Sequence, residues 1–442
     1  MKAPVHVIGA GFAGAAAATA LAERGVPVTL WEARRTPGGR ATSFPDPETG
    51  ELLDNGPHLL LGCYRATRNL LARIGTESAL AFQPRLSLPF ETPWGHAELA
   101  CPRLPGRLSL VAGMMGLGAT SLGDRFSLLS TGQRLGDPVH PEDTVAAWLA
   151  RGRATARARA LLWDPLCRAI MNLEPDEAAA GPFVAALGEA LLGPVEGARA
   201  GWAVPGLGAL MGDALSGYLH ARGGALRHGR VQSIAFGPAD HRVAGLVVGG
   251  QTVPAASVVV ATDPHQALHL VPMGERLTPL RSRLASMPPA AIVSVYLWLD
   301  RPVLPGTGPP LVGLIGGRAE WLFDWGRIHG DGPAGRRLAA VVSAADDLVD
   351  LPAGEIVRRV WAELSDRLPV MARARLLNQR VVKERHATVR LTPGLWRPAA
   401  GEIPGVPGLF LCGDYTDTGL PATIEGAALS GRMVADAAMA GG

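Results

Sequence analysis

The sequence predicts an α/β protein in which a Rossmann-like nucleotide-binding domain carries an inserted α+β domain. Three observations predict it. A glycine-rich turn joins an apolar strand to an alanine-rich helix within residues 5–23, and a second strand–loop–helix pattern occupies residues 409–439. The long stretches between these ends mix helical and strand-like patterns. The nucleotide-binding domain is therefore expected to be assembled from segments that lie far apart in the chain.

The composition fits a globular protein and excludes several classes of function. Of the 442 residues, 48% are hydrophobic and 18% are charged, and the net charge of +3 comes without a run of Lys or Arg, which argues against a nucleic-acid partner. The four cysteines show no C-x-x-C spacing, so we expect neither a metal site nor disulfides. We find no signal peptide and no stretch long enough to span a membrane, and we expect a cytoplasmic protein.

The first elements form a β-α-β unit. Residues 5–9 are an apolar run typical of a buried strand, residues 15–23 are alanine-rich and helical, and residues 26–31 are a second apolar run. Near the other end, residues 409–412 are apolar and residues 424–439 have helical periodicity. These two ends supply the recognisable parts of a nucleotide-binding sheet.

The middle of the chain supplies further strands and a second body. Strand-like runs at residues 225–231, 243–248 and 258–261 fit a mostly parallel sheet with an antiparallel insertion. The flanking regions contain both helical stretches and strand-like runs. The helical stretches are at residues 144–162 and 355–368, and the strand-like runs are at residues 292–299 and 338–342.

We therefore expect a discontinuous division of the chain. Residues 1–75, 205–271 and 399–442 are assigned to the nucleotide-binding domain. Residues 76–204 and 272–398 are assigned to the substrate-binding domain, which is inserted twice.

The strongest local motif is the glycine-rich turn, G-A-G-F-A-G, at residues 9–14. Gly9 permits the tight turn out of the strand, and Gly11 lets the backbone approach a diphosphate. Gly14 permits close packing of the helix on the strand. A turn of this kind, between a strand and a helix, predicts a dinucleotide site.

The residues around this turn agree with that function. Phe12 and Ala13 open the helix, whose N-terminal N–H groups stabilise a negative charge. Glu32 ends the second strand at the spacing that places a carboxylate beside the ribose hydroxyls. A carboxylate there repels a 2′-phosphate, which disfavours NADP.

A second glycine turn distinguishes FAD from NAD. Ala33 and Arg34 lead into Gly38, Gly39 and Arg40. The paired glycines expose backbone amides, and the arginine offers a planar fork of donors for phosphate oxygens. We expect this turn to hold the same diphosphate as the first one.

The third motif lies near the C-terminal end. Gly413 and Asp414 follow a buried strand, and Thr423 and Ile424 precede a helix. The aspartate can bind ribityl hydroxyls, and the helix would direct its positive end at the flavin edge that becomes anionic on reduction. Three motifs in this order predict FAD, bound non-covalently.

Three longer strings extend the pattern. They are L-D-N-G-P-H-L-L-L-G-C-Y at residues 53–64, K-E-R-H-A-T at 383–388 and G-D-Y-T-D-T-G-L-P-A-T-I-E at 413–425. With these strings the chain resembles the FAD-dependent amine oxidase and phytoene desaturase superfamily over nearly its whole length. Within that superfamily it resembles the bacterial squalene-associated branch of the hopanoid pathway.

The resemblance implies a glutathione-reductase-type FAD domain with an inserted substrate domain and an apolar tunnel that meets the flavin. It places Pro57 and His58 beside the isoalloxazine ring and the backbone of Val231 at the adenine. Pro57 stands where the related segment often has a polar residue such as glutamine, so a polar contact from position 57 is left open.

The resemblance also implies a reaction. Hydroxysqualene would lose its hydroxyl as water, and hydride from the reduced flavin would replace it to give squalene. The titratable residues in the flavin-proximal motifs are the candidate proton donors; for each of them the alternative is a structural hydrogen bond or salt bridge. They are Asp54, His58, Glu384 and Glu425.

Three other functions stay open. A polyene desaturase would oxidise its substrate. An amine oxidase would need an aromatic cage, which 5% aromatic residues do not favour. A non-catalytic FAD-containing lipid carrier would show no redox change with any polyprene.

The expected partners follow from the C30 isoprenoid substrate. An apolar substrate favours peripheral contact with the inner face of the cytoplasmic membrane, through apolar and basic residues within 105–129, including Leu110 and Met114; a buried helix pair is the alternative there. No second nucleotide motif is present. The reductant of the flavin is therefore expected to be external, either a nicotinamide that docks transiently or a partner reductase.

Overall fold

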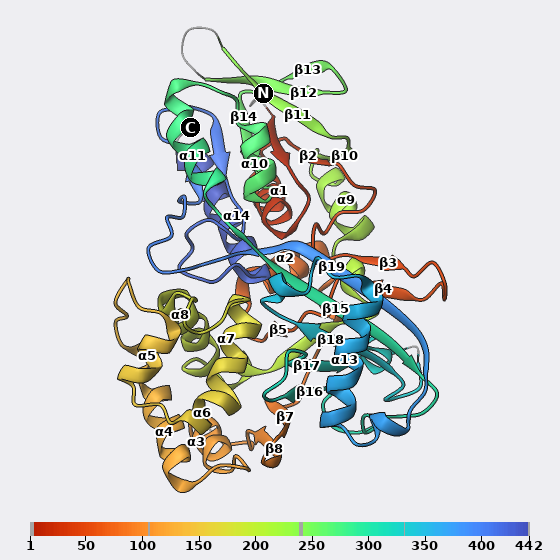
Figure 1. Ribbon diagram of the computed structural model, residues 1–442. Coiled ribbons are helices and arrows are strands. Elements are labelled where there is room, and N and C mark those ends of the chain that lie inside the picture. The colour runs from red at the N-terminus through yellow and green to blue at the C-terminus, as the bar shows by residue number, and fades with distance from the viewer. Residues whose placement is uncertain (1–3, 105–106, 238–241, 331, 441–442) are drawn as a thin grey trace.

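Two large sheets organise the molecule, and their packing confirms the predicted α/β class (Figure 1). The structure is a computed structural model that describes residues 4–104, 107–237, 242–330 and 332–440. One sheet and its helices form the upper half in Figure 1, and the second sheet lies in the lower half beside a lobe of helices.

The upper sheet has six strands and draws them from three distant parts of the chain. Its order is β10 (Ala225–His228), β2 (Val28–Glu32), β1 (Val5–Ile8), β14 (Ser257–Val260), β21 (Leu409–Leu411) and β20 (Gly401–Glu402). All pairs are parallel except β20 with β21. Short apolar runs of this kind fit strands that are covered on both faces.

Helices cover this sheet closely. α1 (Phe12–Glu23) is buried along almost its whole length and packs on α14 (Ile424–Ala440). A Cβ atom added at Gly431 would lie 2.1 Å from the carbonyl oxygen of Ala13, so only glycine permits this approach of the two backbones. The remaining helices of this half are α2 (Arg65–Ile74), α9 (Gly212–His220), α10 (Pro264–Leu270) and α11 (Thr278–Ala285).

A three-stranded antiparallel sheet caps the upper half. It consists of β11 (Val231–Phe236), β12 (Val243–Val248) and β13 (Gln251–Pro254). The run predicted at residues 225–231 is thus divided between two sheets. β10 ends at His228, and β11 starts at Val231.

The lower sheet has seven strands and takes two of them from before the helical lobe. Its order is β19 (Leu376–Val389), β15 (Pro289–Leu299), β18 (Arg337–Val342), β17 (Trp321–Asp324), β16 (Leu311–Leu314), β7 (Ser87–Thr92) and β8 (Gly95–Ala100). Every pair is antiparallel except β16 with β7. α12 (Trp325–His329) and α13 (Ala353–Arg367) belong to this half.

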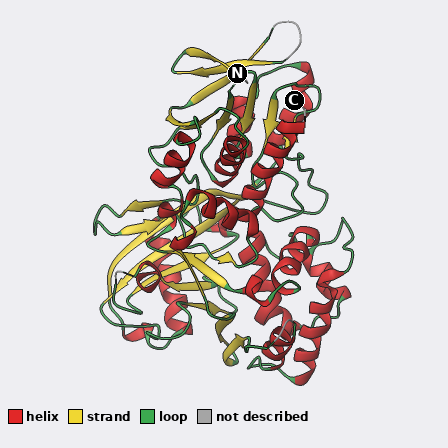
Figure 2. Ribbon diagram, turned by 180° about the vertical axis from the view of Figure 1, so that it is seen from behind, coloured by secondary structure: helices red, strands yellow, loops and turns green. Residues whose placement is uncertain are grey.

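The helical lobe, in red at the lower right of Figure 2, contains α3 (Leu108–Met115), α4 (Leu122–Gln133), α5 (Val145–Arg151), α6 (Ala156–Ala158), α7 (Asp164–Met171) and α8 (Ala180–Leu191). The single helix predicted over residues 144–162 is wrong. α5 ends at Arg151 with Gly152 as its C-cap, and Thr155 starts a new helix by accepting a hydrogen bond from the backbone N–H of Ala158 at 3.2 Å.

Two small sheets connect the halves. β3 (Ser43–Pro45) pairs with β4 (Leu52–Asp54), and β9 (Ala200–Ala203) lies between β5 (Leu60–Leu61) and β6 (Leu80–Phe82). β5 and β9 fall in different parts of the predicted domain division, and that division remains a prediction. None of the helices in the described ranges combines the length and the apolarity that a membrane span requires.

Candidate active site

The glycine-rich turn has the geometry that its sequence requires. Gly9 has φ +101°, and a Cβ there would lie 2.8 Å from the carbonyl oxygen of Ala261. A Cβ at Gly14 would lie 1.8 Å from the carbonyl oxygen of Gly9. Larger residues at these two positions would separate α1 from the sheet.

The N-terminus of α1 is open to an anion. Gly11 is the N-cap residue and offers no side-chain cap, and the first turn has no acidic residue. The N–H groups of Phe12 and Ala13 therefore lie at an uncapped, positive helix end. This is the arrangement that holds a diphosphate in nucleotide-binding folds.

Glu32 lies beside this helix end. It is 6% exposed, and its carboxylate accepts hydrogen bonds from the backbone N–H of Ala10 at 2.9 Å and of Arg34 at 2.8 Å. Each carboxylate oxygen has two lone pairs, so both keep an acceptor position for ribose hydroxyls. Ala33 and Arg34 are exposed at the rim, and the Arg34 guanidinium donates to the carbonyl of Gly39 at 3.0 Å.

The second glycine turn packs directly on the first. The N–H of Gly38 donates to the carbonyl of Ala10 at 2.8 Å. Gly38 and Gly39 both have positive φ, and a Cβ on Gly39 would lie 3.2 Å from the Cα of Gly11. The two turns therefore present their backbones side by side, as one diphosphate bound by both would need.

Arg40 connects the turn to the C-terminal motif. Its guanidinium forms an ion pair with Asp414 at 2.8 Å and donates to the carbonyl of Ala387 at 2.6 Å. A guanidinium has five donors, so these contacts leave others for a phosphate oxygen. The phosphate contact expected of Arg40 stays a prediction.

The C-terminal loop is held by local hydrogen bonds. The N–H of Gly413 donates to the hydroxyl of Ser430 at 3.0 Å, and the hydroxyl of Thr423 accepts from the N–H of Gly426 at 3.2 Å. α14 begins at Ile424. The loop thereby brings the N-terminus of α14 to the same region as Asp414.

The expected adenine contact lies next to Glu32. The N–H of Gly229 donates to the carbonyl of Glu32 at 2.8 Å, and Val231 begins β11 two residues later. The structure thus joins Val231, Glu32, both glycine turns and Asp414 in one continuous strip. An open helix end, a buried carboxylate and two stacked glycine turns fit the diphosphate and ribose of FAD.

The four candidate proton donors have different hydrogen-bond partners. Asp54 is 7% exposed, and its carboxylate accepts from the hydroxyl of Ser43 at 2.6 Å and the N–H of Leu207 at 2.9 Å. His329 Nε2 lies 3.3 Å from its other oxygen. Asp54 therefore joins β4 to α12 and to the loop before α9.

Glu425 has its partners at the start of α2. Its two carboxylate oxygens accept from the N–H groups of Ala66 at 2.8 Å and Thr67 at 2.9 Å, and from the Thr67 hydroxyl at 2.8 Å. A carboxylate in this position caps the helix and offsets its positive end.

Glu384 and His58 lie nearer the Arg40 contacts. Glu384, on β19, accepts from the side-chain amide of Asn55 at 3.0 Å and from the N–H of His386 at 3.3 Å, and it is only partly buried. His58 Nδ1 lies 2.7 Å from the carbonyl of Gly56. Burial lowers the pKa of the His58 imidazole, and the charge of Arg40 acts in the same direction. Pro57, which lies between Gly56 and His58 in the chain, is half-buried.

Three residues with site-like environments are not among the site residues expected from the sequence. His329 meets Asp54 although 275 positions separate them. Tyr64, the last residue of the 53–64 string, hydrogen bonds with Thr423, and burial raises the pKa of its phenol. A sequence search for acids inside the three motifs could not reveal these pairings, because folding alone brings them together.

The third is Glu320, which precedes β17. It is 5% exposed, and it pairs with Arg168 of α7 through one oxygen only. Burial raises the pKa of this carboxyl to about 7, against the opposing charge of Arg168.

The fold and this strip define the class of protein. The family described as flavin containing amine oxidoreductase matches residues 12–439. The chain belongs to that family, and it is an FAD-dependent oxidoreductase.

Within the family, the chain is 35% identical to hydroxysqualene dehydroxylase of Rhodopseudomonas palustris over 100% of both chains. It is 24% identical to the 15-cis-phytoene desaturase of Narcissus pseudonarcissus, over 98% of this chain and 78% of that one. Among solved structures, an oxidoreductase from Methanosarcina mazei has a TM-score of 0.74 at 18% identity and covers 97% of this chain and 99% of its own.

Proposed function

We propose that this enzyme reduces hydroxysqualene to squalene. The allylic hydroxyl leaves as water after it receives a proton, and a hydride takes its place on the same carbon. When bound, reduced FAD supplies that hydride from N5. The observation that carries the proposal is the 35% identity to a hydroxysqualene dehydroxylase over the full length of both chains.

The packing of the aromatic residues supports a polyprene over an amine. Tyr296 and Trp325 meet edge to face with ring centroids 5.8 Å apart, which leaves no slot between them for an amine. Tyr415 is fully buried, and Tyr64 is committed to Thr423. None of the direct ring contacts among the described residues pairs two tyrosines.

We propose Glu384 as the first proton donor to test. The oxygens of Glu425 already accept three hydrogen bonds, and those of Asp54 have three partners. His58 has a lowered pKa, which makes the imidazole a poorer reservoir of protons at neutral pH. Glu384 is partly exposed and lies on the strand that Arg40 contacts. Asp54 and Glu425 would then hold the site in place.

Anaerobic turnover in D2O tests the reaction. The enzyme is reduced with dithionite in D2O, hydroxysqualene is added, and the product is analysed by mass spectrometry and NMR. Because the hydrogen on reduced N5 exchanges with solvent, we expect squalene with one deuterium at the former carbinol carbon and one flavin oxidised for each molecule formed. Squalene without deuterium, or formed without flavin oxidation, would contradict the proposal.

Variants of the enzyme in the same assay distinguish the candidate proton donors. Glu384→Gln is expected to slow turnover by about 10²–10⁴-fold, the usual range for general acid catalysis, while FAD content is unchanged. Glu425→Gln and Asp54→Asn are the matched comparisons, and their main expected effect is on thermal stability. A Glu384→Gln variant with normal turnover would remove Glu384 from the mechanism.

A polyene desaturase is the second candidate, because the phytoene desaturases also match nearly the whole chain. That function would show the opposite direction of electron flow. Oxidised enzyme would then become reduced on anaerobic addition of phytoene, and hydroxysqualene would leave reduced enzyme unchanged.

We also propose that the tip of the helical lobe contacts a membrane surface. Leu108 and Val111 of α3 are 61% and 40% exposed, and Leu122 and Phe126 of α4 are 64% and 63% exposed. The exposed Arg107 adjoins them. Apolar side chains with an adjoining basic residue are typical of a shallow interfacial contact.

The exposed residues of this proposed membrane contact differ in part from those expected from the sequence. Met114 and Leu117 are buried in the core of the lobe, at 2% and 0% exposure, and Leu110 is half-buried. Residues 105 and 106 lie outside the described residues. The external reductant of the flavin remains part of the proposal.

A further inference from the structure

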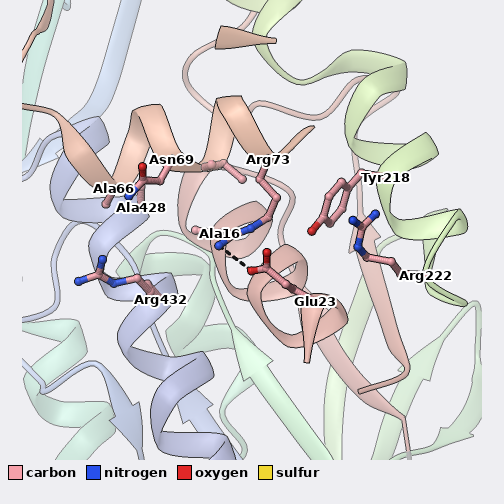
Figure 3. A pocket seen from close by; sticks show the side chains of 10 residues that line it. Ala16, Glu23, Ala66, Asn69, Arg73, Tyr218, Arg222, Ala428 and Arg432 are labelled. Atoms are coloured by element: carbon pink, nitrogen blue, oxygen red, sulfur yellow. Dashed lines mark ion pairs between the residues drawn. The ribbon is translucent and has the colours of Figure 1, made fainter. Parts of the chain in front are cut away.

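A pocket of about 470 Å³ lies on the upper half of the molecule, apart from the flavin strip (Figure 3). Four helices line it: α1, α2, α9 and α14. Its size is in the range of small-molecule sites, which is about 300–1,000 Å³. The flavin strip uses the N-terminal residues of α1, whereas this pocket is lined by Ala16 and Glu23, further along the same helix.

Small apolar side chains leave the space open. Ala16, Ala66 and Ala428 come from α1, α2 and α14, and each is at most 8% exposed. Methyl groups at these positions keep the helices close while leaving room above them. The polar lining residues then determine which ligand fits.

The polar lining is mainly cationic. Arg73, Arg222 and Arg432 line the pocket, against one acidic side chain, Glu23. Arg73 and Glu23 form an ion pair at 2.8 Å. Figure 3 shows Arg432 on one side of the pocket and Arg222 on the other, so the two charges flank the space between them.

Tyr218 supplies an independent sign of a missing ligand. Tyr218 is only 9% exposed, and its hydroxyl has no hydrogen-bond partner. Buried hydroxyls in native proteins almost always have a partner. Figure 3 shows this hydroxyl pointing towards the Arg73 side of the pocket. The Nε–H of Arg73 is also buried without a partner.

The neighbouring charges suit an anion. The guanidinium of Arg222 stacks on the Tyr218 ring, 3.7 Å from its centroid, which fixes both side chains. Burial raises the pKa of the Tyr218 phenol, so the hydroxyl stays protonated and can donate. Guanidinium groups match the geometry of phosphate oxygens.

We propose that this pocket is a second binding site, specific for a small molecule that carries a phosphate or diphosphate group. The phosphate is held by Arg73, Arg222 and the hydroxyl of Tyr218, and Arg432 faces it from α14. A soluble phosphate ester and a phospholipid headgroup share this chemistry. The site is separate from the FAD diphosphate site and from the hydroxysqualene reaction.

Isothermal titration calorimetry tests the proposal on FAD-loaded protein, so that the flavin site is filled. Inorganic pyrophosphate is the soluble probe. Vesicles of phosphatidylglycerol, compared with phosphatidylcholine, are the lipid probe. We expect binding of one pyrophosphate per chain; binding of phosphatidylglycerol vesicles alone would identify a headgroup as the source.

Two variants and a control locate the binding. Arg222→Gln/Arg432→Gln is expected to weaken binding by tenfold or more, whereas Arg373→Gln, which removes an exposed arginine of the lower half, changes nothing. Tyr218→Phe is expected to weaken binding about tenfold, the effect of losing a hydrogen bond to a charged group. Because that hydroxyl has no partner without ligand, the Tm of ligand-free Tyr218→Phe is expected to be unchanged or higher.

Absence of binding by both probes, or equal binding by the double variant, would overturn the proposal. A lower Tm of ligand-free Tyr218→Phe would also count against it, because the hydroxyl would then serve the fold.

Discussion

At the scale of single residues, the ion pair between Arg40 and Asp414 joins two motifs that lie 374 positions apart. Each side chain had been expected to meet FAD separately. Their pairing, together with the contact of Arg40 to β19, makes the arginine a connector of three segments. Its loss would therefore disturb the strip as a whole.

The first prediction concerns FAD retention. Glu32→Ala is expected to weaken FAD binding by about 1.5–3 kcal/mol, because hydrogen bonds from ribose hydroxyls to a carboxylate are lost. Arg40→Ala is expected to weaken it further by releasing Asp414. Flavin released on denaturation, measured by absorbance for each chain, gives the occupancy. Full FAD occupancy in the Glu32→Ala/Arg40→Ala double variant would contradict the site assignment.

The second prediction concerns pH and Glu320. Its folded-state pKa is about 7, above the ordinary value of 4.5, because burial disfavours the ionised form. The stabilisation from the protonated acid is therefore fully present below about pH 4.5 and is lost as the pH rises through 7. The loss is at most about 3–4 kcal/mol, at 1.36 kcal/mol for each pKa unit between 4.5 and about 7.

Denaturant unfolding at pH 5 and pH 8 measures it. Glu320→Gln is neutral at both pH values, so its free energy of unfolding is expected to fall less than that of the parent protein. Glu174→Gln is the control, because Glu174 contacts the same Arg168 but is 41% exposed. An equal fall in the parent and in Glu320→Gln would show that the Glu320 carboxyl does not titrate in this range.

At the scale of elements, the sequence predicted the strands and helices whose apolar pattern is unbroken. β1, α1, β2, β21 and α14 lie within a few residues of their predicted positions. The helix predicted over residues 144–162 failed, because its apolar periodicity continues through a break that Gly152 and the capping Thr155 impose. The apolar periodicity of a segment shows which face is buried. It does not show where the helix ends and the chain changes direction.

The candidate site likewise has one part that the sequence predicted and another part that it did not. The glycine turns and Glu32 follow from local geometry, which the spacing determines. The partners of Asp54 and Glu425 come from residues far along the chain, at His329 and at Ala66 and Thr67. No spacing rule contains such contacts, so the roles of these acids could not be read from the motifs.

The third prediction concerns α3 and α4. Leu108→Asp/Phe126→Asp is expected to abolish flotation of the protein with liposomes, because both side chains are more than 60% exposed and only their apolar surface would contact the lipid. Stability is expected to change little, since neither side chain is in the core. Leu377→Asp, at a position 64% exposed on β19, is the matched control. Unaltered flotation in the double variant would place the membrane contact elsewhere.

At the scale of the whole molecule, the upper sheet depends on both ends of the chain. β14 lies between β1 and β21, so the strand that completes the parallel sheet arrives only at residue 409. The Gly431 contact then seats α14 on α1. The sheet is one continuous hydrogen-bonded unit although its strands are widely separated in sequence.

The fourth prediction tests whether FAD binding requires the C-terminal segment itself or only its position at the end of the chain. Truncation after Pro398 removes β20, β21 and α14 and is expected to abolish FAD binding. A circular permutant that links the two ends and opens the exposed loop around residues 305–308 is expected to keep FAD, because both ends lie at the same end of the molecule (Figure 1). Absorbance at the flavin band measures both. A truncated protein that still carries FAD would show that the C-terminal segment is dispensable.

The late arrival of β21 and α14 has a consequence for synthesis in the cell. At about 5–20 residues per second, the ribosome needs roughly 20–80 s to proceed from Glu32 to Asp414. For that time α1 exists without α14, which packs on it in the folded protein, and the alanine-rich face of α1 is exposed to other nascent chains. We expect FAD to protect this intermediate poorly, because the C-terminal motif of its proposed site has not yet been translated. Slow translation or scarce chaperones are therefore expected to lower the yield of folded enzyme.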